Sequence, residues 1–133
     1  METASRTVTQ GDIDQFARLS GDRNPLHTDE AFARTTPMGG RVAHGLLCAS
    51  VATGLIYDTG VTAGTALGML ETSWRFVAPV RPGDTIRARL EVIEKRETRK
   101  PDRGIVIRRC ELRNRHDELV CEGTLTTMIR RRT

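Results

Sequence analysis

The chain has 133 residues, of which 38% are hydrophobic and 29% are charged, and this is enough to bury the core of one domain. No apolar run is long enough to cross a bilayer, and Met1–Ser5 lacks the basic and apolar regions of a signal peptide. We therefore expect a single domain over residues 1–133, located in the cytoplasm and without a membrane partner.

Charge is spread unevenly along the chain, whose formal net charge is +4. Residues 1–80 carry 6 basic and 8 acidic groups, whereas residues 81–133 carry 15 basic and 9 acidic groups. The basic half allows an anionic partner such as a phosphate-bearing small molecule. Aromatic residues make up only 4% of the chain, so platforms for base stacking are scarce and we expect no nucleic-acid partner.

The three cysteines, Cys48, Cys110 and Cys121, are widely spaced and form no Cys-x-x-Cys pair. An odd number of cysteines without that spacing is typical of reduced thiols. We therefore expect buried or inert thiols and no metal site.

The first predicted element is a helix over residues 9–19. Thr9 and Asp12 match a capping box, in which the side chains of the N-cap and of the third helical residue bond each other's backbone. Ile13 and Phe16 fall on one side of this helix, which indicates a buried face.

The loop after this helix brings together a carboxylate, an amide and an imidazole. Asp22, Asn24 and His27 fall within six residues, with Gly21 before them and Pro25 among them. Glycine permits unusual backbone angles and proline fixes its own φ, so we expect an ordered, non-helical loop that holds these side chains in fixed directions. Such a loop can supply a base and an acid, although Asp and Asn are also ordinary turn residues.

A short helix over residues 28–34, capped by Thr28, is expected next. Residues 42–57 then contain no charged side chain. A helix that is apolar all round belongs in the interior of a protein, so we predict a buried central helix from about Gly45 to Asp58.

The second half of the chain alternates between apolar and polar residues, which predicts an antiparallel sheet. The predicted strands cover residues 67–76, 86–92, 105–113 and 119–129. In the first of them, Leu70, Trp74 and Phe76 are expected to lie on one side, opposite Glu71, Ser73 and Arg75. The apolar face of the sheet and the apolar central helix must both be buried, and they can be buried against each other. We therefore predict a two-layer α+β fold.

Three segments resemble signatures of one family, the MaoC-like (R)-specific enoyl-CoA hydratases. The first is similar to the hydratase motif of that family and reads Phe16-x-x-Leu19-Ser20-Gly21-Asp22-x-Asn24-Pro25-Leu26-His27-x-Asp29-x-x-x-Ala33. The other two are shared more widely among hotdog-fold proteins. They read Val42-Ala43-His44-Gly45-Leu46-Leu47-x-Ala49-Ser50 and Phe76-x-x-Pro79-Val80-x-x-Gly83-Asp84-Thr85.

The resemblance implies a single hotdog fold, in which an antiparallel sheet wraps a long central helix, in agreement with the predicted two layers. It also implies reversible hydration of a trans-2-enoyl-CoA to an (R)-3-hydroxyacyl-CoA, with no cofactor, because coenzyme A is part of the substrate. The catalytic pair of the family falls on Asp22 and His27, which would share a water molecule and the roles of base and acid. Asn24 would orient that water or His27, and either member of the pair can protonate C2.

The thioester oxygen gains negative charge during such a reaction and needs hydrogen-bond donors. Gly45 is expected to begin the central helix, where backbone N–H groups are unpaired, so we assign its N–H to the oxyanion hole; a packing role for this glycine stays open. We expect His44 to make a structural hydrogen bond. The resemblance suggests that Thr53 and Ile56 line the acyl pocket, and plain core packing is the alternative.

The same site suits a second activity. A MaoC-type (3R)-hydroxyacyl-acyl-carrier-protein dehydratase of fatty-acid synthesis would keep Asp22 and His27 and is the main alternative. Thioesterases and the better-known carrier-protein dehydratases place a carboxylate on the central helix, and none lies between Gly45 and Tyr57. Non-catalytic hotdog partner subunits usually lack the acid–base pair. The resemblance also implies a homodimer or higher homo-oligomer, because the substrate tunnel of the family runs along the subunit interface.

Overall fold

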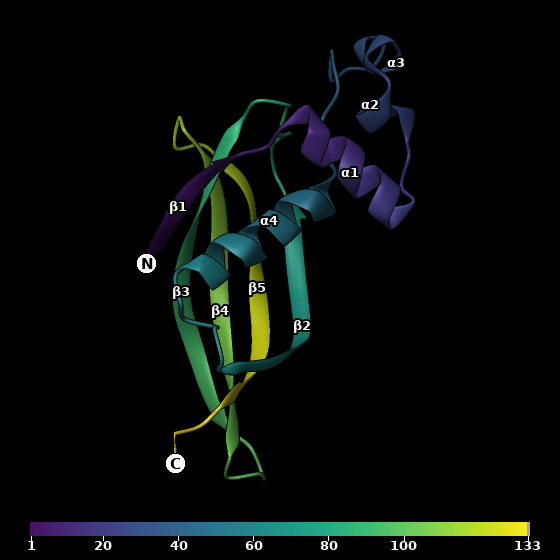
Figure 1. The fold of residues 1–133 in the computed structure, drawn as a ribbon. Helices are drawn as coiled ribbons and strands as arrows, with labels where there is room; N and C mark the ends of the chain where they lie inside the picture. Colours follow the sequence, from purple (N-terminus) through teal and green to yellow (C-terminus); the bar gives the residue numbers. More distant parts are fainter. Residues whose placement is uncertain (133) are drawn as a thin grey trace.

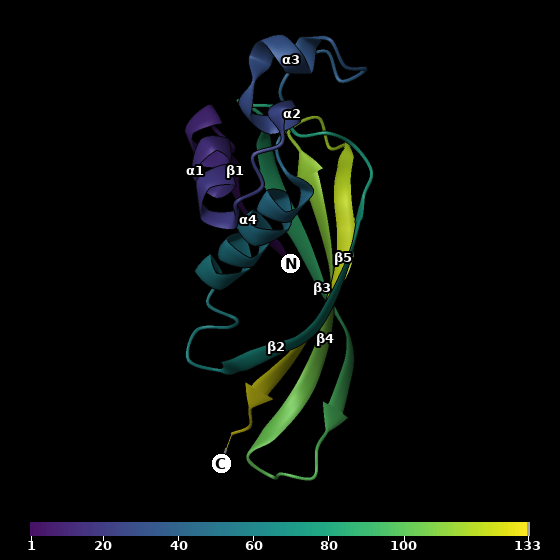
Figure 2. The same ribbon diagram turned by 90° about the vertical axis from the view of Figure 1, so that its right-hand side faces the viewer.

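A computed structural model describes residues 1–132, in which five antiparallel strands form one sheet (Figure 1). The strands lie in the order β1-β3-β4-β5-β2. Their bounds are Glu2–Thr7 (β1), Ala66–Phe76 (β2), Thr85–Glu97 (β3), Arg103–Asn114 (β4) and Leu119–Arg130 (β5). Helix α4 (Gly45–Asp58) lies across one face of this sheet, and α1 (Gln10–Ser20) lies on the same side (Figure 2). The predicted α+β hotdog fold is confirmed.

The core forms where α4 meets the inner face of the sheet. The buried side chains of α4 are Leu47, Cys48, Ala49, Val51, Ala52, Leu55 and Ile56. Those of the sheet that pack against them include Ile86, Ala88, Leu90, Cys110, Leu112 and Leu125. Each fully buried aliphatic side chain stabilises the fold by about 1.5–3 kcal/mol, so this interface is the main source of stability.

One face of α4 is not part of that core. Leu46, Thr53 and Tyr57 are exposed, with Leu46 at 65% and Tyr57 at 60% of their full accessible area. The predicted bounds of the central helix are confirmed, whereas its predicted burial all round is wrong. The reason is that the sheet covers only one side of α4.

Strand β2 also departs from the prediction. It pairs only with β5 and is an edge of the sheet, and its register shifts between Ala66 and Gly68 and between Met69 and Glu71. Leu70 and Phe76 are about half exposed and Trp74 is only partly buried, so the apolar positions of this strand are not part of the core. A strand at an edge lacks a neighbour on one side, and bulges rotate its side chains away from the alternating pattern.

Strand β1 is the element that the sequence does not predict. Its residues are almost all exposed, so no apolar alternation marks it. Backbone pairing with β3 holds it in place, with Ser5 opposite Arg87 and Thr7 opposite Thr85.

Helix α1 begins as predicted. The side chain of Thr9 accepts a hydrogen bond from the N–H of Asp12, and the carboxylate of Asp12 accepts one from the N–H of Thr9. The backbone bond from Thr9 is the main reason that the pKa of Asp12 lies below its usual value. Gly21 ends the helix with φ at 81°, a left-handed conformation that glycine adopts without strain.

Two predictions for the following segment are wrong. Pro25–Thr28 is not an extended loop but one helical turn, α2, because proline is well suited to the first position of a helix. The next helix, α3 (Glu30–Arg34), is capped by Asp29 rather than by Thr28. The carboxylate of Asp29 accepts a hydrogen bond from the N–H of Phe32, whereas the hydroxyl of Thr28 bonds backbone carbonyl groups behind it.

The three cysteines are free and buried, as predicted. Burial raises the pKa of Cys48 and of Cys110 to about 11 and that of Cys121 to about 12. No helix in the described part of the chain combines the length and the apolar character needed to cross a membrane.

Candidate active site

The turn α2 presents His27. Asn24 caps this turn, since its side-chain oxygen accepts a hydrogen bond from the N–H of Leu26 at 3.1 Å. The Nδ1 of His27 lies 2.7 Å from the carbonyl oxygen of Val42. A carbonyl can only accept, so Nδ1 carries the hydrogen and Nε2 of the neutral ring is left with its lone pair. His27 is thereby prepared to take a proton through Nε2.

His44 supports this arrangement from behind. Its ring stacks on that of His27, with centroids 3.8 Å apart and an angle of 25° between the planes. Its Nε2 donates to the carbonyl oxygen of Asp22 at 2.9 Å. The predicted structural hydrogen bond of His44 is confirmed. The other nitrogen, Nδ1, is buried without a hydrogen-bond partner among the described residues.

Asp22 completes the group at the beginning of the loop, directly after Gly21. Its carboxylate accepts a hydrogen bond from the N–H of Asn24 at 3.3 Å, which limits its rotation. One polar side-chain atom from each of Asp22, His27 and His44 lies within 4.8 Å of the others. A carboxylate and an imidazole at this separation have room for a water molecule between them, hydrogen-bonded to both.

The same three side chains are the metal-ligand types gathered at this site. The two imidazole rings stack nearly parallel, and each directs one nitrogen to a backbone carbonyl. A carboxylate beside an imidazole that keeps one free nitrogen is also the pairing that proton transfer requires.

Gly45 follows His44 directly and begins α4. The helix has no side-chain cap, so the N–H groups of its first turn are free to bind an oxygen atom at the positive end of the helix. Gly45 lines a cavity of about 270 Å³ together with Leu26 and Phe76. A Cβ atom at position 45 would lie 2.9 Å from the ring of Phe76, so the close packing that was the alternative role of this glycine is present.

Arg41 is a site residue that the sequence analysis missed. It is only 5% exposed, and its Nε donates to the carbonyl oxygen of His27 while its Nη2 donates to the carboxylate of Asp14, each at 2.5 Å. It therefore ties α2 to α1 and steadies the backbone of His27. An arginine immediately before a charge-free segment is the signal that points to such a role.

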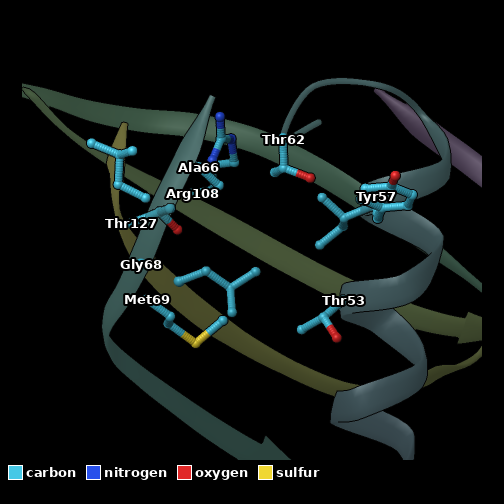
Figure 3. A pocket seen from close by; sticks show the side chains of 11 residues that line it. Thr53, Tyr57, Thr62, Ala66, Gly68, Met69, Arg108 and Thr127 are labelled. Carbon is cyan, nitrogen blue, oxygen red and sulfur yellow. The ribbon is translucent and has the colours of Figure 1, made fainter. Parts of the chain in front are cut away.

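Thr53 and Ile56 lie elsewhere. They line a second cavity of about 340 Å³, between the C-terminal half of α4 and strand β2 (Figure 3). Thr53 is eight residues beyond Gly45, which is about 12 Å along a helix. The structure thus gathers Asp22, Asn24 and His27, with His44 against them and Gly45 next to His44 in the chain, and places Thr53 and Ile56 on a separate cavity further along α4.

A model of the MaoC like domain matches residues 1–110. The chain is 45% identical over 102 residues to Protein MaoC of Klebsiella aerogenes, a match that covers 77% of this chain and 30% of that protein. It is 31% identical over 126 residues to a mitochondrial 3-hydroxyacyl-[acyl-carrier-protein] dehydratase of Arabidopsis thaliana, covering 94% of this chain and 72% of that protein. The chain spans less than two thirds of the length of several relatives it matches.

Among solved structures, the (R)-hydratase from A. caviae involved in PHA biosynthesis superposes with a TM-score of 0.79 at 30% identity, covering 96% of this chain and 92% of that one. The similarity includes the whole segment that carries Asp22, His27 and Gly45. Sequence motif, fold and site geometry agree, and the chain belongs to the MaoC-like family of hydratases and dehydratases.

Proposed function

We propose that this protein is an (R)-specific enoyl-CoA hydratase. It adds water across the double bond of a trans-2-enoyl-CoA and gives an (R)-3-hydroxyacyl-CoA. The observation that carries the proposal is the state of His27 beside Asp22: its Nδ1 is bound to the carbonyl of Val42, which leaves Nε2 as a free acceptor, and a ring nitrogen of His27 lies within 4.8 Å of a carboxylate oxygen of Asp22. The substrate supplies the coenzyme A, and the reaction needs no further cofactor.

The chemistry follows from the positions of three groups. A water molecule between Asp22 and His27 loses a proton to one of them while its oxygen forms a bond to C3. The electron pair of the double bond moves through C2 onto the thioester oxygen, where the N–H of Gly45 stabilises the charge. C2 then receives the proton that the pair took from the water, and the thioester carbonyl forms again. Dehydration is the same sequence in reverse.

We further propose that the protein works as a homodimer in the cytoplasm. Large apolar side chains are exposed along the edge strand β2 and on the open face of α4, namely Leu46, Tyr57, Leu67, Met69, Leu70 and Phe76. An apolar strand edge of this kind favours pairing with a second copy. The free buried thiols fit a reducing compartment.

A dehydratase acting on an acyl carrier protein is the second candidate. The Arabidopsis thaliana relative carries that name, and the strongly basic second half of the chain would suit an acidic carrier. The two functions share the chemistry at Asp22 and His27 and differ only in the group that holds the thioester.

A panel of trans-2-enoyl thioesters tests both functions. Each acyl group is offered as its CoA ester and as its carrier-protein ester, and loss of the ultraviolet absorbance of the conjugated enoyl thioester measures hydration. We expect turnover of CoA esters and an (R)-alcohol by chiral analysis of the product. Turnover of carrier-protein esters alone would favour the second candidate, and an (S)-alcohol would contradict both.

A further inference from the structure

Strand β4 carries an arginine on the face that packs against α4. The buried residues of this strand alternate and are Gly104, Val106, Arg108, Cys110 and Leu112. Arg108 is only 8% exposed, although it occupies a position where its neighbours on that face are small or apolar. Burying a guanidinium costs free energy of folding unless the group is paired with an anion or hydrogen-bonded.

Arg108 has no such partner within residues 1–132: no carboxylate lies within ion-pair distance and its guanidinium makes no hydrogen bond. Arg41, the other buried arginine, is bonded to Asp14 and to the carbonyl of His27. Burial alone lowers the pKa of Arg108, with no nearby anion to oppose it. Arg108 is thus largely buried, while its guanidinium nitrogens keep some access to the surroundings and have no partner in the described chain, so the group is available to an anion that is not part of the chain.

Arg108 is one of the residues that line the cavity of Thr53 and Ile56. Figure 3 shows Arg108 and Thr127 on the sheet side, facing Thr53 and Tyr57 on α4. The described residues around this cavity include no Asp or Glu, and hydroxyl groups are its other polar atoms. The remaining lining is apolar, so the cavity fits a chain of methylene groups that ends in an anion.

We propose that this cavity binds the far end of an acyl chain that terminates in a carboxylate, held by Arg108. The proposal rests on the proposed hydratase function and names its substrate class, the mono-thioesters of unsaturated dicarboxylic acids. A single guanidinium matches a single carboxylate in charge and in two-pronged geometry. The phosphates of coenzyme A fit less well, because they carry more charge, and Arg108 is the one charged residue among those that line this largely apolar cavity.

The distance along α4 sets a length requirement. Gly45 is assigned to the thioester oxygen, and the cavity begins at Thr53, about 12 Å further along the helix. A short dicarboxylic chain cannot join the two points. Activity is therefore expected to rise with chain length up to the length that brings the carboxylate to Arg108.

The test compares two substrate series: mono-CoA thioesters of trans-2-alkenedioic acids of increasing length, and enoyl-CoAs of the same lengths that end in a methyl group. The variants are Arg108→Met, which keeps the size of the side chain but removes the charge, and Arg109→Met as the matched control. Arg109 is adjacent on β4 but exposed on the opposite face. We expect Arg108→Met to lower kcat/KM for the best dicarboxylic substrate by about 10²–10³-fold, the scale of a lost buried charge pair.

The same variant is expected to leave the methyl-ended series within about threefold of the wild type, since only the carboxylate contact is lost. Arg109→Met is expected to leave both series unchanged. An equal loss in both series would instead place a coenzyme A phosphate on Arg108. Loss of the dimer in Arg108→Met by light scattering would show that a carboxylate of the second subunit pairs with it. Either result overturns the proposal.

Failure of the hydratase function can be distinguished from failure of this inference. If no thioester is hydrated, titration calorimetry with saturated dicarboxylic mono-CoA thioesters and their methyl-ended counterparts still measures the contact. Tighter binding of the dicarboxylic series, lost in Arg108→Met, supports the site. Hydration of the methyl-ended series, with no preference for a carboxylate in either assay, refutes the site and leaves the hydratase function standing.

Discussion

The rings of His27 and His44 stack 3.8 Å apart, and each ring directs one nitrogen to a backbone carbonyl. His27 is thus held in one tautomer and one orientation by the carbonyl of Val42 and by a second imidazole behind it. His44 in turn holds the carbonyl of Asp22. One compact unit therefore fixes both members of the proposed catalytic pair, and mutations in it should separate chemical from positioning roles.

Asp22→Asn and His27→Gln should each lower kcat by about 10²–10⁴-fold, the contribution of a positioned acid or base. Both replacements keep the size of the side chain and remove its ability to exchange a proton at neutral pH. Circular dichroism and thermal unfolding should match the wild type. Near-normal turnover by either variant would exclude that residue from proton transfer.

His44→Phe should lower kcat by about tenfold with little change in thermal stability. The phenyl ring can still stack on His27, but the hydrogen bond to the carbonyl of Asp22 is lost, and a hydrogen bond is worth about 1 kcal/mol. The buried unpaired Nδ1 is also removed, which offsets part of that loss in stability. His116→Phe, at an exposed turn, is the control, and an equal effect there would argue against a positioning role for His44.

Gly45→Ala should lower the stability of the wild-type protein and raise that of the Phe76→Leu variant. In the wild type the new methyl group meets the ring of Phe76 at 2.9 Å, which we expect to destabilise the fold by about 1 kcal/mol. After Phe76→Leu the contact is relieved, and alanine should then stabilise the first turn of α4 by about 0.5–1 kcal/mol. Chemical denaturation of the four proteins measures the coupling. Additive effects would show that Phe76 is not the obstacle.

Arg41→Met should lower the free energy of unfolding by about 2 kcal/mol, because the carbonyl of His27 and the carboxylate of Asp14 both lose a charged donor. Turnover should fall as well, because Arg41 no longer bonds both α1 and α2 and the position of His27 on α2 becomes less fixed. Arg34→Met removes an exposed pair with Glu30 and is expected to change stability by less than about 0.5 kcal/mol. Urea unfolding compares the two variants.

The cysteines predict how stability depends on high pH. Burial holds the pKa of Cys48 and Cys110 at about 11 and that of Cys121 at about 12, whereas an unfolded thiol ionises near 9. Above pH 9 the unfolded chain therefore binds fewer protons than the folded one, so stability falls as the pH rises. Each thiol contributes up to about 1.4 kcal/mol per pH unit. Urea unfolding between pH 7 and about 10.5 measures how the free energy of unfolding changes with pH. Cys110→Ala should make this dependence on pH less steep.

Local patterns determined the parts of this protein that depend on residues close together in the chain. The capping box at Thr9 and the charge-free run of residues 42–57 predicted α1 and α4, because a helix satisfies its bonds within a few residues. Asp22 and His27 lie five positions apart, so one loop and one helical turn suffice to bring them together. The family resemblance rests on the same short segment.

Tertiary structure decided which face each element turns inward and which distant groups meet. The edge position of β2 follows from a strand order that differs from the chain order, so its alternation did not predict burial. Arg108 is in phase with Val106 and Cys110, yet its charge indicated a solvated face until the sheet and α4 enclosed it. The carbonyl of Val42, which sets the tautomer of His27, is a backbone group fifteen residues away, and only the folded chain brings the two together.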